Sequence, residues 1–123
     1  MDVRVIKKEI KQIFQHLKIP PHFKGYEYAI DCLVELMYDR RQLSRLVKGL
    51  YVKVAEKHST TPTRAERGIR YLIERASQSN PEIWGKYFVN SRPSNKEFLA
   101  TVLGEIIDHD SQGEGLLVLP SRG

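Results

Sequence analysis

The side chains best suited to chemistry lie close together in one segment: Arg64, Glu66, Arg67 and Arg70. An arginine guanidinium can donate two hydrogen bonds to O6 and N7 of guanine, and a glutamate carboxylate can accept one from the amino group of cytosine. At about 100° per residue, the arginines fall on the polar side of a helix. We therefore predict a helix that reads base edges in a DNA major groove. The alternative is a helix face whose charges only keep it solvated.

The elements around this segment are those of a helix-turn-helix. Between residues 43 and 55, apolar residues recur at the spacing of one buried helix face. Those residues are Leu43, Leu46, Val47, Leu50, Tyr51, Val54 and Ala55. A polar turn follows at residues 58–60, which are His, Ser and Thr. This order predicts a first helix, a tight turn and then the helix that carries the arginines.

The start of the second helix has its own signals. Thr61 is a suitable N-cap, and Pro62 suits the first helical position because its missing N–H would be unpaired there anyway. Thr63 and Glu66 offer an overlapping capping box as an alternative start. The predicted buried side consists of Ala65, Ile69, Leu72, Ile73 and Ala76. Tyr71 and Glu74 fall on the opposite side with the arginines.

Helical spacing predicts further helices along the chain, and no segment shows convincing strand alternation. A first helix must end before Pro20–Pro21, and a second follows Gly25. Two more are expected from Asn80–Pro81 and from Ser94. Their predicted buried residues are Ile6, Ile10, Ile13, Phe14 and Leu17, then Tyr26, Ile30, Leu33, Val34 and Met37, then Ile83, Trp84, Tyr87 and Phe88, and finally Phe98, Leu99, Val102, Leu103 and Ile106. The aromatic residues among them favour a core role over stacking on bases.

The approach to the last helix is basic and polar, and comprises Arg92, Ser94, Asn95 and Lys96. Positive side chains beside unpaired backbone N–H groups can hold a DNA phosphate. The competing interpretation is that Ser94 caps the helix with Glu97 while the cations face water. We place one helical domain at residues 1–107 and a linker-like tail at 108–123. The tail either docks on the domain or a second subunit, or is a disordered or vector-derived end.

Composition restricts the class of protein. The chain has 123 residues, enough for one domain, and a formal net charge of +5, which favours a polyanionic partner without requiring one. No apolar run approaches the roughly 20 residues that span a bilayer, so no membrane role is expected. The N-terminus does not resemble a secretory signal. The single cysteine, Cys32, is predicted to be a core residue, and a cytoplasmic location is the natural inference.

An enzyme is not expected. The histidines are scattered and lack the spacing of metal ligands, and Cys32 has no neighbouring histidine in sequence. The chain has no glycine-rich phosphate loop, and Asp108 and Asp110 lie in the linker-like segment. We predict no catalytic residue, no metal site and no cofactor. The alternative to DNA binding is a helical protein-interaction module or antagonist that keeps the fold but does not bind DNA specifically.

Several segments resemble a known family. They are Lys24-Gly25-Tyr26, Leu50-Tyr51, Val54-Ala55, the run from Thr60 to Arg70, and the run from Pro93 to Phe98. Over roughly residues 10–107 they are similar, in the same order, to the C-terminal effector domains of the stage zero sporulation protein A family of response regulators. Two positions depart from the family pattern, since Tyr71 replaces a usual His and Gly68 a usual Ala. In that family a receiver domain precedes the effector, so the chain is either an excised effector or a standalone relative.

The resemblance implies an all-α fold of six helices built around a helix-turn-helix. It implies that Arg64, Glu66 and Arg67 read a TGTCGAA-like box in double-stranded DNA, with Arg70 beside them. The candidate contacts to the DNA backbone are Thr60, Thr61, Thr63, Tyr71, Arg92, Ser94, Asn95 and Lys96. It also implies a contact between residues 78–86 and the sigma subunit of RNA polymerase, and pairing of two copies on tandem DNA sites.

Overall fold

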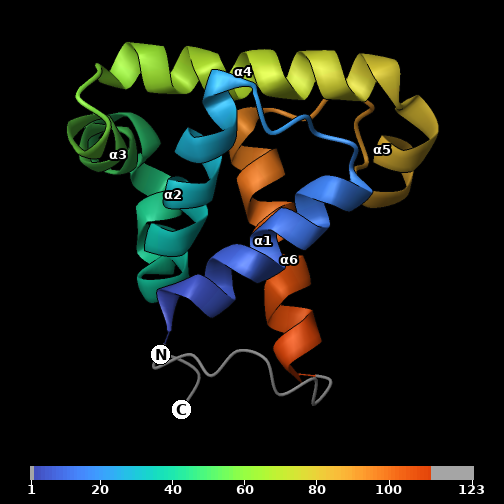
Figure 1. Ribbon diagram of the computed structural model, residues 1–123, viewed down its shortest axis with the longest axis horizontal. Coiled ribbons are helices and arrows are strands. Elements are labelled where there is room, and N and C mark those ends of the chain that lie inside the picture. The colour runs from blue at the N-terminus through green and yellow to red at the C-terminus, as the bar shows by residue number, and fades with distance from the viewer. Residues whose placement is uncertain (1, 112–123) are drawn as a thin grey trace.

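The computed structural model describes residues 2–111, which form six α-helices and no strand (Figure 1). The helices are α1 (Val3–His16), α2 (Lys24–Tyr38), α3 (Tyr51–Lys57), α4 (Pro62–Ser79), α5 (Pro81–Tyr87) and α6 (Asn95–Ser111). Helix α4 runs along the upper edge in Figure 1, while α2 and α6 descend from it and α1 crosses in front. The predicted all-α fold with six helices is confirmed.

The core lies between α1, α2, α4 and α6. The residues predicted to be buried in α1, α2 and α6 are buried, as are Trp84 and Phe88, whereas Ile83 and Tyr87 are partly buried. The Trp84 ring stacks on Phe98 with 5.7 Å between ring centroids, and its Nε1 donates to the Leu17 carbonyl at 2.9 Å. The core role predicted for Trp84 and Phe88 is therefore confirmed, since neither ring is free to stack on a base.

The first helix of the motif differs from the prediction. A 3-10 helix, η1 (Arg40–Arg45), and one turn of π-helix, η2 (Leu46–Leu50), precede α3. Leu43 and Leu46 are only partly buried, and Val47 is 68% exposed. The 3-10 turn advances about 120° per residue and the π turn less than the α-helical 100°, so the assumed face does not persist. The predicted burial was wrong for Val47 and right for Leu50, Tyr51, Val54 and Ala55.

The ends of two helices follow the predicted capping chemistry. The backbone N–H of Arg64 donates to Thr61 Oγ1 at 3.1 Å, so Thr61 caps α4, and the alternative start at Thr63 is wrong. At α6 the backbone N–H of Ser94 donates to Glu97 Oε1 at 2.8 Å, and the N–H of Glu97 donates to Ser94 Oγ at 3.1 Å. This reciprocal pair is the predicted capping box.

The C-terminal boundary of the last helix also differs from expectation. Helix α6 continues to Ser111, so residues 108–111 extend the helix instead of starting a linker. The apolar part of the tail, residues 116–119, lies outside the described residues. Within residues 2–111, no helix combines the length and apolar character that would let it cross a membrane.

Candidate nucleic-acid interface

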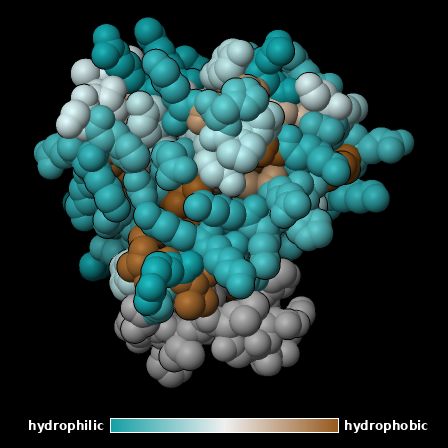
Figure 2. All heavy atoms as spheres, in the orientation of Figure 1, coloured by the Kyte–Doolittle hydropathy of each residue, from teal (hydrophilic) through white to brown (hydrophobic). Residues whose placement is uncertain are grey.

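Helix α4 presents a polar face to solvent and an apolar face to the core. Ala65, Ile69, Leu72, Ile73 and Ala76 are buried, as predicted from their spacing. Arg64, Arg67 and Arg70 are exposed, and Tyr71 is 54% exposed. Figure 2 shows mostly hydrophilic atoms along the edge that α4 forms. The helix therefore offers cations outward from a rigid support, which is the arrangement that a major-groove reader needs.

The turn before α4 is anchored by a buried carboxylate. His58 hydrogen-bonds through Nε2 to Oδ2 of Asp31 on α2, and the Asp31 side chain is only 5% exposed. Lys57 Nζ lies 3.5 Å and Lys7 Nζ 3.8 Å from the other carboxylate oxygen. Sequence reasoning placed His58 only in the turn, because its partner is distant along the chain. The interaction holds the turn against α2 and so helps to fix where α4 begins.

One flank of α4 touches α2 through two glycines. A Cβ added to Gly25 would lie 2.1 Å from the carbonyl oxygen of Gly68, which no side chain could tolerate. A Cβ added to Gly68 would lie 3.1 Å from the Tyr28 ring. The two backbones approach more closely than larger residues would allow. The helices therefore cross at a fixed depth, which accounts for a small residue at position 68.

The opposite flank carries an ion pair between two predicted base readers. Arg70 Nη1 lies 2.9 Å from Glu66 Oε2, and the two side chains are 55% and 28% exposed. They stand four residues apart, at the spacing where side chains on one helix meet. In the free protein the glutamate charge is therefore partly neutralised, and the Arg70 guanidinium is occupied on one side. Arg64 and Arg67 form no ion pair within residues 2–111.

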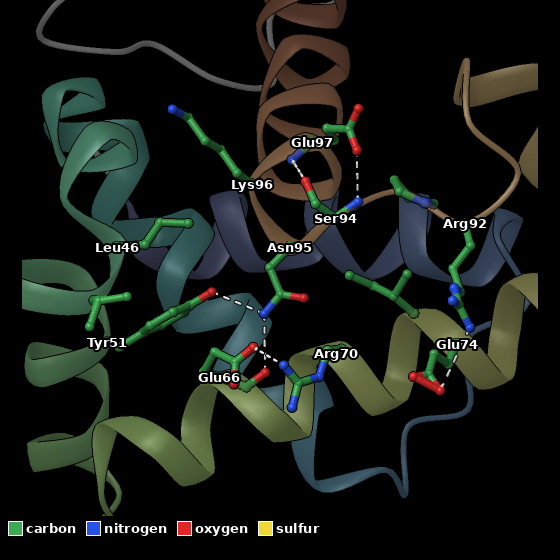
Figure 3. Close-up of a pocket in the computed structure, with 13 residues that line it drawn as sticks. Leu46, Tyr51, Glu66, Arg70, Glu74, Arg92, Ser94, Asn95, Lys96 and Glu97 are labelled. Carbon is green, nitrogen blue, oxygen red and sulfur yellow. Dashed lines mark hydrogen bonds and ion pairs between the residues drawn. The ribbon is translucent and has the colours of Figure 1, made fainter.

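Asn95 joins three helices on this same flank. Its Nδ2 donates to the Tyr51 hydroxyl at 3.0 Å and to the Glu66 backbone carbonyl at 3.1 Å (Figure 3). A backbone carbonyl can only accept, so the amide must present its nitrogen to α4. Burial raises the pKa of Tyr51 to about 12 and keeps its hydroxyl protonated. The sequence predicted a DNA-backbone contact for Asn95, and its geometry shows two internal partners that spacing could not reveal.

The other predicted backbone contacts are spread around α4. Thr60 and Thr63 lie at the turn and first helical turn, with Thr63 exposed, and Thr61 is occupied as the cap. Arg92 Nη1 lies 3.9 Å from Glu74 Oε1 on α4, and the Ser94 hydroxyl belongs to the capping box. The exposed Lys96 side chain points away from α4 (Figure 3). A groove between η2, α4 and the start of α6 includes Arg70, Arg92, Asn95 and Lys96 in its lining.

No metal or thiol chemistry is indicated by the described part of the chain. Among residues 2–111 no group of His, Cys, Asp and Glu side chains could hold a metal ion. Cys32 is buried, and that burial raises the pKa of its thiol far above the ordinary value. The predicted core role of Cys32 is confirmed, and the thiol is shielded from reaction in the folded protein.

Helix α4 packs an apolar face against the core and exposes an arginine-rich face, and a tight turn joins it to the supporting helix α3. This is the arrangement of a helix-turn-helix DNA-binding domain. The comparison with protein families agrees with this class. Residues 10–106 match the family described as Sporulation initiation factor Spo0A C terminal. The chain belongs to this family, and the resemblance inferred from its sequence is confirmed. Its members are DNA-binding effector domains of sporulation response regulators, and the family is not one of enzymes.

Proposed function

We propose that this chain is a sequence-specific regulator of transcription whose helix α4 reads a TGTCGAA-like box in double-stranded DNA. The observation that carries the proposal is the exposed arginine face of α4, fixed to the core by the buried residues on its other side. Arg64 and Arg67 are the readers of guanine because both are exposed and unpaired within residues 2–111. Glu66 accepts from a cytosine amino group, and Arg70 lies beside it.

Binding proceeds in two physical stages. Lysines and arginines first attract the phosphate backbone, because neutralising phosphates releases counterions, and this attraction weakens as salt rises. Thr60, Thr61, Thr63 and Tyr71 then contact the strand beside α4. Arg92, Ser94 and Lys96 serve the strand beside the start of α6, whereas Asn95 is left out of this set because both hydrogens of its amide are already donated to Tyr51 and Glu66. Base contacts choose the site, and each good bidentate pair contributes about 1 to 3 kcal/mol of discrimination.

The experiment is fluorescence anisotropy with a labelled duplex carrying the box and with a scrambled duplex, each over a salt series. We expect tighter binding to the box that persists at moderate salt. Arg67→Ala should abolish the preference for the box, whereas Lys8→Ala removes an equal charge from an exposed position on α1 and should preserve it. An unchanged preference in Arg67→Ala would remove Arg67 from the site. Failure to bind either duplex would instead support the protein-interaction alternative.

Two protein contacts belong to the same proposal. Residues 78–86, which include most of α5, form the surface for the sigma subunit of RNA polymerase, since α5 follows the reading helix directly. A second copy binds the neighbouring box when two boxes stand in tandem. Analytical ultracentrifugation with one-box and two-box duplexes tests the pairing. Two bound copies on the longer duplex and one on the shorter would support it.

A further inference from the structure

We infer that Asn95 and Tyr51 form a positioning pair that sets the base specificity of Glu66, without contact between the pair and a base. This inference rests on the proposed function and names the residues that orient one of its readers. Asn95 Nδ2 uses both of its hydrogens, one on the Tyr51 hydroxyl and one on the Glu66 carbonyl. Helix α6 is thereby tied to α3 and to the first turns of α4.

The Glu66 backbone is held at the point where orientation matters most for reading. Recognition helices of this class contact bases with their N-terminal residues. Glu66 lies in this part of α4, and its carboxylate is also held, by Arg70 at 2.9 Å. Backbone and side chain are therefore fixed by separate partners. A small rotation of the first turns would move the carboxylate away from a cytosine amino group, since hydrogen bonds weaken steeply with distance and angle.

Tyr51 makes the pair testable because it cannot touch DNA. Tyr51 is only 2% exposed, and burial keeps its hydroxyl protonated. Removing its oxygen therefore changes base preference only through neighbouring protein groups, and Asn95 is the side chain that hydrogen-bonds to this oxygen. Asn95 itself is partly exposed and lies beside the predicted phosphate contacts, so a change there alone would not separate positioning from direct contact.

The experiment compares Tyr51→Phe, Asn95→Ala and Glu66→Ala on the box and on duplexes with one base pair changed at each position in turn. We expect all three variants to lose discrimination at the same position, by about tenfold. Tyr51→Phe and Asn95→Ala should bind a scrambled duplex at the wild-type level, whereas Glu66→Ala should bind it more tightly because it removes a negative charge and releases Arg70. The double variant Tyr51→Phe/Asn95→Ala should lose little more than either single variant, because the two residues act through one connection.

A matched control is available at the same end of α6. Asn90 Nδ2 donates to Glu97 Oε2 at 3.0 Å, an exposed amide hydrogen bond with no partner on α4, so Asn90→Ala should keep the full preference. The inference is overturned if Tyr51→Phe folds and discriminates as the wild type does. It is also overturned if Asn95→Ala weakens box and scrambled duplex alike, which would indicate a direct phosphate contact. A wild-type protein that shows no preference contradicts the proposed function itself, a separate and recognisable result.

Discussion

The two flanks of α4 are held by different kinds of contact, close backbone packing on one and hydrogen bonds with an ion pair on the other. Gly68 and Glu66 stand two residues apart, so they face nearly opposite sides of the helix. At Gly68 the backbone of α2 approaches until no Cβ fits on Gly25. At Glu66 the neighbours are polar, namely the Asn95 amide and the Arg70 guanidinium. The glycine flank fixes how closely the helices pack, whereas the polar flank fixes orientation and leaves packing unchanged.

The most damaging change on the glycine flank is Gly25→Ala. The added Cβ would lie 2.1 Å from the Gly68 carbonyl oxygen and 2.5 Å from its carbon, so backbone must move. We expect a loss of unfolding free energy at or above about 3 kcal/mol, the upper end for overpacking. Urea denaturation measures it. Gly104→Ala on α6 is the control, because nothing lies near its Cβ position, and it should be neutral or stabilising.

The stability that Tyr51 contributes on the polar flank should depend on pH in the alkaline range. The pKa of Tyr51 rises from an ordinary value of 10.0 to about 12 on folding. The folded state then holds the proton more tightly than the unfolded state, so this contribution is complete below pH 10 and is lost as pH rises towards 12. We expect the wild type to lose about 2 to 3 kcal/mol more than Tyr51→Phe across that window.

Chemical denaturation of both proteins at a series of pH values measures this difference. Both retain Cys32, whose thiol pKa is also raised by burial, so its contribution to alkaline unfolding is common to the two curves. At neutral pH the variant should be less stable by about 1 kcal/mol, because one hydrogen bond is missing. Parallel curves from pH 8 to pH 12 would show that Tyr51 ionises as readily in the folded protein as in the unfolded chain.

The two flanks also show what sequence alone could predict. The faces of α4 and its N-cap Thr61 follow from local spacing, and the structure confirms both. The partners of Asn95 stand 44 and 29 residues away, at Tyr51 and Glu66. No local pattern encodes such contacts, so Asn95 was predicted only from its basic neighbours.

Irregular backbone set a second limit on prediction. The spacing from Leu43 to Leu50 suits an α-helix, but the chain passes through 3-10 and π turns, which leaves Val47 exposed. A periodicity argument assumes a constant rotation per residue and fails where that rotation changes. The close approach of α2 to α4 at Gly25 and Gly68 could not be predicted either, because the packing of these two segments depends on the whole fold.

A smaller loss of stability is expected from a change at the N-cap of α4, which belongs to neither of the two flanks. Thr61→Ala removes the oxygen that accepts from the Arg64 N–H, so it should cost about 1 kcal/mol of stability. Thr63→Ala is a matched control, because Thr63 is exposed and caps nothing within residues 2–111. Thermal unfolding of the two variants measures the difference. Equal losses would mean that the cap contributes no more than any threonine on this surface.

The smallest effect is expected at Gly68, although it lies at the same crossing as Gly25. Alanine is a better helix former than glycine by about 1 kcal/mol, which favours Gly68→Ala. The new Cβ would lie 3.1 Å from Tyr28 Cδ2, and this ring belongs to a partly buried side chain that can shift by a few tenths of an ångström. The two terms nearly cancel, so urea denaturation should show a change within about 0.5 kcal/mol of zero.

The comparison of Gly68→Ala with Gly25→Ala separates two kinds of close contact. The added atom meets an aromatic ring in the first case and a helix backbone in the second. A ring can rotate about its side-chain bonds, whereas a carbonyl within α4 cannot move without disturbing the helix hydrogen bonds. If Gly68→Ala proves as damaging as Gly25→Ala, the Tyr28 ring must be as rigid as backbone. The edge-to-face contact of Tyr28 with His58, at 5.1 Å between ring centroids, would then be the cause, because His58 is itself fixed by Asp31.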